Sequence, residues 1–333
     1  MKILITNDDG ISSNGIITLA NKFKEMGEVI VVAPEMQMSA TSHSLTTGKP
    51  LREHKYYINN EFFGYAINGS PADCVKFAIL TILEKVKPDI VLSGINFGRN
   101  TGINLLYSGT FAGATEGHLS GIPSFAVSLS SHNHKTDCQT AADYTYKIVS
   151  EIMMRHDKEK IFLNINVPAV SADLIKGIKI TKNSSSYWED EFEKRIDPFG
   201  KPYYWFNGLY VYDANEEEID DLAVDENYVS VTPIRFQFTN LVQMEELRGL
   251  EHLNTDSKEQ AIKQDIIAEI EPIEFQEVDK EIEKVLEERK TESGDIERSN
   301  KIAEEPRIDK SMPEEETEQA LEDKLVTRSL KDM

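Results

Sequence analysis

Cysteine is scarce in this chain. The 333 residues include only two, Cys74 and Cys138. Two thiols cannot build a disulfide framework, and they are too few for a thiolate zinc cage. We therefore expect a protein of a reducing compartment, such as the cytoplasm.

Basic side chains and long hydrophobic runs are also in short supply. The chain has 36 Lys and Arg against 58 Asp and Glu, a net charge of −22. Binding to a phosphate backbone needs a clustered cationic face, so we expect no nucleic-acid duplex among the partners. No segment approaches the roughly 20 apolar residues of a transmembrane helix, and the first residues show no h-region or cleavage site, so we expect no signal peptide. We expect a soluble protein that does not bind membranes.

The acidity is concentrated near the C-terminal end. The last 80 residues carry 25 acidic and 13 basic side chains, and their one aromatic residue is Phe275. Such a segment buries too little apolar surface to offset the ordering of its backbone. We expect residues 254–333 to form a largely disordered or helical tail. Apolar spacing between Pro272 and Lys290 is typical of an amphipathic helix, either solvated or binding a partner.

Residues 1–168 alternate between strand and helix patterns. Apolar runs such as Ile3–Thr6 and Val29–Ala33 are separated by helical segments, which is typical of a parallel sheet covered on both faces. We predict an α/β fold here, a doubly wound sheet in three α/β/α layers. In residues 169–253, the aromatic segment Tyr187–Tyr212 is broken by Pro and Gly, which favours β-hairpins. We expect this part to form a smaller, β-rich accessory or dimerising lobe.

The clearest functional signal is the pair Asp8 and Asp9, directly after the first strand. Ligands of open α/β sheets bind beyond the carboxyl ends of the strands. Two adjacent carboxylates repel each other unless a cation or hydrogen-bond donors compensate. Mg²⁺ or Mn²⁺, which prefer oxygen ligands, would do so. Asn-Asp-Asp-Gly is also ordinary turn chemistry, and on this motif alone the turn is the favoured interpretation.

Two further strand ends carry matching chemistry. The expected strand Val29–Ala33 runs into a hydroxyl-rich stretch. The expected strand Ile90–Leu92 runs into Gly, Asn and Ser residues ahead of a helix. Glycines allow close backbone approach, and helix N-termini favour anions. Hydrolysis of phosphate monoesters needs acceleration of up to about 10²¹, which a metal ion combined with an anion nest can supply. The polar residues at these two ends are Ser39, Asn96, Asn100, Ser108, Gly109 and Thr110.

At these residues the sequence resembles the SurE family (survival protein E), which are metal-dependent nucleotidases. The resemblance covers residues 1 to about 250 and does not reach the tail. It departs from the family pattern at Glu35, Ser70, Ile103 and Asn104, which bears on substrate preference. The matching segments are ILITNDDG (3–10), GSPADCV (69–75), SGINFGRNTG (93–102), YSGT (107–110), LNINVP (163–168) and YVSVTPI (228–234).

The resemblance implies a Rossmann-like core and a phosphomonoesterase that hydrolyses nucleoside 5′- or 3′-monophosphates, with exopolyphosphatase activity as an additional reaction. It implies one Mg²⁺ or Mn²⁺ per subunit, and a homodimer whose C-terminal lobes exchange elements, with a tetramer as the alternative. A non-catalytic nucleotide-binding or interaction protein that uses its acidic tail is the competing hypothesis. The implied metal ligands are Asp8, Asp9, Ser39 and Asn96, of which Asp8 and Asn96 are also catalytic; the implied phosphate contacts are Asn100, Ser108, Gly109 and Thr110.

Histidines offer weaker signals. His43 could protonate the leaving oxygen of a substrate, but a loop histidine is more often only a surface donor. His132 and His134 lie one residue apart, as in a metal pair on a strand. Their polar surroundings favour a solvated turn instead.

Overall fold

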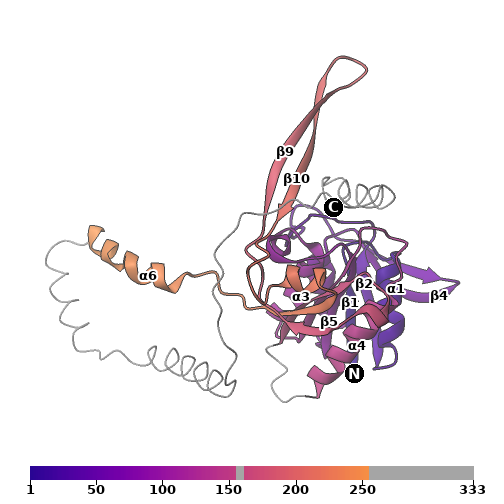
Figure 1. The fold of residues 1–333 in the computed structure, drawn as a ribbon. Helices are drawn as coiled ribbons and strands as arrows, with labels where there is room; N and C mark the ends of the chain where they lie inside the picture. The colour runs from indigo at the N-terminus through magenta and orange to yellow at the C-terminus, as the bar shows by residue number, and fades with distance from the viewer. Residues whose placement is uncertain (155–160, 255–333) are drawn as a thin grey trace. The chain divides into compact units, whose positions relative to one another are not determined.

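The computed structural model describes residues 1–154 and 161–254 (Figure 1). The chain divides into two compact units, and the boundary lies between Arg235 and Phe236. Almost all of the expected acidic tail, including the amphipathic segment from Pro272 to Lys290, lies outside the described residues.

The first unit is built on a nine-stranded sheet in the order β3-β4-β2-β1-β5-β6-β7-β11-β8. Neighbouring strands run parallel from β4 to β7 and again between β11 and β8, whereas β3 pairs antiparallel with β4, and β11 with β7. The predicted α/β fold is confirmed. The strands are β1 (Lys2–Thr6), β2 (Glu28–Pro34), β3 (Glu53–Ile58), β4 (Glu61–Ile67), β5 (Ile90–Phe97), β6 (Ser124–Ser130), β7 (Phe162–Pro168), β8 (Gly177–Ile180) and β11 (Tyr228–Pro233).

Helices cover both faces of this sheet. Successive residues of a strand point to opposite sides, so each buried strand places apolar side chains on both faces. Ile3 and Ile5 of β1 belong to one core cluster, with residues of α1 and α4. Leu4 belongs to a second cluster, with residues of α2. The helical elements are α1 (Asn14–Phe23), α2 (Pro71–Phe77), η1 (Ala78–Ile82), η2 (Gly102–Leu106), α3 (Gly109–Leu119), α4 (Gln139–Met153), η4 (Ala172–Leu174) and α5 (Asp220–Asp225).

Serine caps fix the starts of three of these helices. The side chains of Ser13 and Ser108 accept hydrogen bonds from the backbone N–H groups three residues later. Ser70 forms a reciprocal capping box with Asp73, and proline follows it in the first turn. Such caps stabilise a helix by about 1 kcal/mol and decide where it begins. The start of α3 therefore lies immediately after Ser108.

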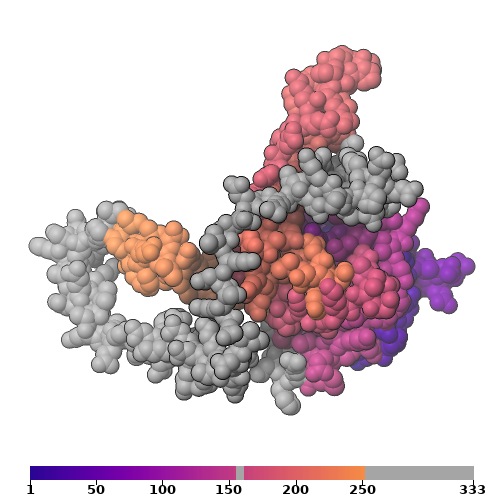
Figure 2. Space-filling model, viewed as in Figure 1, coloured from indigo at the N-terminus to yellow at the C-terminus, as the bar shows by residue number. Residues whose placement is uncertain are grey.

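A long hairpin of β9 (Tyr187–Ile196) and β10 (Pro202–Val211) forms a separate two-stranded sheet. It extends away from the nine-stranded sheet (Figures 1 and 2). At its tip, Asp197 accepts hydrogen bonds from the N–H groups of Phe199 and Lys201. The hairpin expected from the aromatic segment is present. By contrast, β8 and β11, from the region expected to form an accessory lobe, extend the main sheet.

In the second unit, the described residues form α6 (Leu241–Leu247) and the short helix η5 (Arg248–Asn254). Asn240 caps α6 by accepting a hydrogen bond from the N–H of Gln243. Arg248 forms a bidentate pair with Glu245. Within the residues that the structure describes, no helix combines the length and the apolar character needed to cross a membrane.

Candidate functional site

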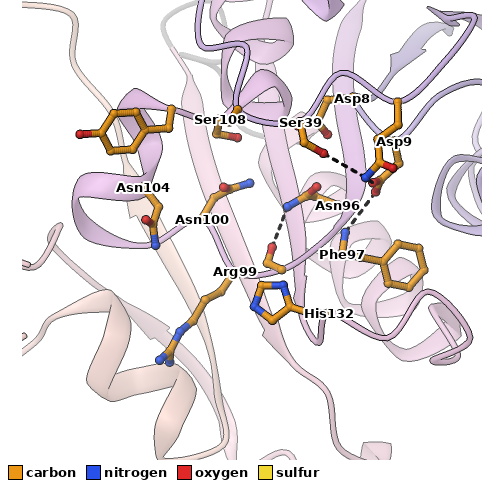
Figure 3. Close-up of a pocket in the computed structure, with 14 residues that line it drawn as sticks. Asp8, Asp9, Ser39, Asn96, Phe97, Arg99, Asn100, Asn104, Ser108 and His132 are labelled. Atoms are coloured by element: carbon orange, nitrogen blue, oxygen red, sulfur yellow. Dashed lines mark hydrogen bonds between the residues drawn. The ribbon is translucent and has the colours of Figure 1, made fainter. Parts of the chain in front are cut away.

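The candidate site lies where the strand order reverses. From β1 the chain builds the sheet in one direction through β2 and β4, and it then returns to the other side of β1 with β5, β6 and β7. Such a reversal creates a crevice at the carboxyl ends of the strands. One pocket occupies this position (Figure 3), and the predicted site residues Asp8, Asp9, Ser39, Asn96, Asn100 and Ser108 all line it.

Asp8 is fastened to the start of α3. The residue is 6% exposed. The backbone N–H of Thr110 donates to its Oδ2 at 3.0 Å, and the Thr110 hydroxyl donates to its Oδ1. A Cβ on Gly109 would lie 2.8 Å from the Cβ of Asp8, so only glycine allows this approach. Of the predicted phosphate contacts, Gly109 and Thr110 thus meet Asp8 itself.

Asp9 is joined to both neighbouring strand ends. Its Oδ2 accepts a hydrogen bond from the N–H of Phe97 at 3.2 Å, and its Oδ1 accepts one from Gln37 Nε2 at 3.3 Å. The same Gln37 amide donates to Ser39 Oγ at 2.9 Å (Figure 3). The loop after β2 is therefore held against the end of β1.

The orientation of the Asn96 amide follows from its hydrogen bond to Gly98. Its Nδ2 donates to the carbonyl oxygen of Gly98 at 2.7 Å. A carbonyl can only accept, so the nitrogen must face Gly98 and the oxygen Oδ1 faces another way. Asn96 lines the pocket, and this bond leaves its neutral Oδ1 available as a ligand.

The charges of the two aspartates favour a cation between them. Burial raises the pKa of Asp8, against the hydrogen bonds from Thr110 that lower it. Burial and the nearby charge of Asp8 raise the pKa of Asp9 to about 7. Two carboxylates, a hydroxyl and an amide oxygen form the hard donor set that Mg²⁺ and Mn²⁺ prefer.

Asn100 is held by a buried amide cluster on the neighbouring strands. Asn166 accepts from the N–H of Asn100 at 2.8 Å and donates to its carbonyl at 3.1 Å, and Asn164 donates to the same carbonyl at 2.7 Å. The side-chain Nδ2 of Asn100 donates to Ser128 at 2.9 Å. These contacts explain the polar residues in the otherwise apolar strand β7, because they fix a residue that lines the pocket.

One histidine, His132, differs from the expected solvated turn. His132 lines the pocket, and its ring approaches Gly98 so closely that an added Cβ there would lie 3.0 Å from it. The available sequence signal was its position just after β6, a neighbour of β5. His43 does not line the pocket; its Nε2 lies 2.6 Å from Glu116, whose other carboxylate oxygen lies 2.8 Å from Lys76.

The fold and the pocket together define a Rossmann-like α/β protein with an acidic site at the strand ends. A family model described as "Survival protein SurE" matches residues 3–190. The chain is 43% identical over 238 residues to a protein of Chlorobium phaeobacteroides named 5′-nucleotidase SurE, covering 72% of this chain and 92% of that one. It is 45% identical over 240 residues to the protein of that name in Thermosipho africanus, covering 72% and 93%.

Solved structures agree with this likeness. The crystal structure of the SurE protein from Aquifex aeolicus matches with a TM-score of 0.65 and 38% identity, over 75% of this chain and all of that one. The chain belongs to the SurE family. The predicted family and the prediction of an enzyme are thereby confirmed.

Proposed function

We propose that the chain is a divalent-metal-dependent phosphomonoesterase that hydrolyses nucleoside 5′- or 3′-monophosphates. The observation that carries this proposal is the convergence of Asp8, Asp9, Ser39 and Asn96 on one pocket, beside the capping residue Ser108 of α3. The relatives named 5′-nucleotidase support the choice of substrate class.

Each residue has a separate task in this proposal. Asp8, Asp9, Ser39 and Asn96 hold one Mg²⁺ or Mn²⁺, which when bound polarises phosphoryl oxygens and activates water. The two donors of Thr110 keep the Asp8 carboxylate in place, where it orients the attacking water and accepts its proton. Asn100 and Ser108 bind the phosphoryl oxygens as neutral donors.

The competing hypothesis is a nucleotide-binding or interaction protein without turnover. Two adjacent carboxylates in the pocket, of which Asp8 is buried, favour catalysis, because a simple binder of phosphate gains nothing from negative charge at that position. The test measures phosphate release from AMP with Mg²⁺, Mn²⁺ or EDTA, for the native chain and for Asp8→Asn. We expect metal-dependent release that Asp8→Asn reduces at least about 100-fold. Equal rates in the two proteins would remove Asp8 from the mechanism.

The same assay decides the finer points of substrate choice. A panel of 5′- and 3′-nucleoside monophosphates and a short polyphosphate, each tested with both metals, ranks the substrates. We expect release from the nucleotides and slower release from polyphosphate. Truncation after Leu253 serves as the test of the tail, and unchanged turnover would assign it a role outside catalysis.

We further propose that the chain works as a homodimer joined through its hairpin. Large apolar side chains on β9, on β10 and at the tip are exposed to an unusual degree, such as Phe192 at 66% and Phe199 at 88%. Exposed apolar groups of this size mark association surfaces. Sedimentation analysis should give a dimer, or a tetramer formed from dimers, and replacement of both phenylalanines by serine should yield monomers.

A further inference from the structure

We propose that Asn104 determines substrate specificity by donating a hydrogen bond from its amide to the nucleoside half of the substrate, an inference that rests on the function proposed above. Asn104 belongs to η2 and lines the pocket. In Figure 3 it lies at the opposite end of the pocket from Asp8 and Asp9, with Asn100 and Ser108 between them in that view.

The orientation of the Asn104 amide follows from its partner. The indole Nε1 of Trp188, at the base of the hairpin, donates to Asn104 Oδ1 at 2.9 Å. Indole N–H is only a donor, so it must meet the oxygen of the amide. The NH₂ group of the amide therefore points away from Trp188. It carries two hydrogen-bond donors and no acceptor. The residue as a whole is buried, at 6% exposure.

The backbone that carries Asn104 is rigidly held. The N–H of Gly102 donates to Asp220, and the N–H of Ile103 donates to Ser186 Oγ, each at 2.9 Å. The hydroxyl of Thr101 donates to Asp221 at 2.5 Å. A donor fixed in this way loses little conformational entropy when it binds a ligand, which is what a specificity contact requires.

The position of Asn104 indicates which part of the substrate it meets. Ser108 follows four residues later, just past the end of η2 at Leu106. The N–H groups of Tyr107 and Ser108 still donate to carbonyls three residues back, so a 3₁₀-like rise of about 2.0 Å per residue puts the Cα atoms of Asn104 and Ser108 on the order of 8 Å apart. A group that contacts Asn104 while Ser108 holds the phosphoryl oxygens is therefore the adjoining nucleoside. Its acceptors are ribose oxygens and the oxygens and nitrogens of the base.

The experiment compares nucleotide with a phosphate ester that has no nucleoside. KM and kcat are measured for AMP, ribose 5-phosphate and p-nitrophenyl phosphate. Asn104→Leu removes the donor without adding charge; Trp188→Phe keeps the ring that packs on Tyr210 but releases the amide. We expect Asn104→Leu to raise KM for AMP about 5- to 10-fold with little change in kcat, Trp188→Phe to raise it less, and both to leave KM for p-nitrophenyl phosphate within about twofold.

Further arms separate the sources of the effect. Asn104→Asp keeps an acceptor for Trp188 and should also raise KM for AMP, whereas the exposed Asn60→Asp adds the same charge and should change nothing. A penalty that persists with ribose 5-phosphate assigns the contact to the sugar, and one that vanishes assigns it to the base. Because Asn104→Leu leaves the Trp188 N–H without its partner, the double variant Asn104→Leu/Trp188→Phe guards against misfolding.

Parallel changes for AMP and p-nitrophenyl phosphate, or no change for either, would overturn the inference. Failure of the proposed function has a different signature, since the native chain would then release no phosphate from any of the three compounds. In that case, calorimetric titration with AMP still tests Asn104. Weaker AMP binding by Asn104→Leu supports the contact, and equal binding overturns it.

Discussion

Replacing Asp9 by Asn should stabilise the metal-free protein at neutral and alkaline pH. Burial and the charge of Asp8 raise the pKa of Asp9 from 3.8 to about 7 in the folded chain. A carboxyl with a raised pKa contributes stability that is present below its unfolded pKa and is lost as the pH rises through its folded value. Ionised Asp9 therefore weakens the metal-free fold most above pH 7.

The magnitude follows from the same pKa values. The difference between 3.8 and about 7 corresponds to at most about 4 kcal/mol. Asp9 is not fully buried, so solvent screening reduces this. We expect Asp9→Asn to raise the free energy of unfolding by about 1–3 kcal/mol at pH 8 and by little at pH 4, with the difference levelling off above pH 7.

Urea denaturation in EDTA at pH 4, 5, 6, 7 and 8 measures this difference, with the exposed Asp173→Asn as the matched control. Saturating Mn²⁺ should reverse the order, because an ion at about 1,000 times its Kd stabilises the native chain by about 4.1 kcal/mol. The reasoning is refuted if Asp9→Asn is less stable than the native chain in EDTA at pH 8, or if the difference does not vary with pH.

Three other substitutions test contacts of α3 and of the amide cluster around Asn100. Gly109→Ala should lower stability by about 1–3 kcal/mol and reduce phosphate release, since the new Cβ would lie 2.8 Å from the Cβ of Asp8; denaturation and turnover check this. Glu116→Gln should lower the free energy of unfolding by about 1–3 kcal/mol at pH 7 and by less at pH 4. Despite its burial, its two basic partners lower the pKa of Glu116, and stability from a lowered pKa is lost on acidification. Denaturation at both pH values measures the difference. Asn166→Ala should raise KM by freeing the backbone of Asn100, and an unchanged KM would contradict the role given to the amide cluster.

The alternation of strands and helices was predictable from the sequence because each buried strand is a short apolar run. The position of the site was predictable for a related reason. Strand ends of a parallel sheet meet at one edge, so Asp8, Ser39 and Asn96 could be placed together without knowing any distance. The resemblance to a family added the assignment of these residues as metal ligands.

Contacts between distant residues were not predictable in this way. The bond between Thr110 and Asp8 spans 102 positions, and that between Trp188 and Asn104 spans 84. Neither local propensity nor periodicity encodes such pairings, which depend on how the elements pack. The position of His132 in the pocket and the pairing of β11 with the main sheet also depend on this packing, so neither was predictable.

The claim on which the account depends is that four oxygen-bearing side chains surround one metal ion. Anomalous diffraction from crystals of the chain grown with Mn²⁺ tests it most directly. The account predicts a single strong peak per chain, bounded by oxygens of Asp8, Asp9, Ser39 and Asn96, and no peak there in Asp9→Asn. A peak bound to other residues, or none in a chain that still releases phosphate, would contradict it.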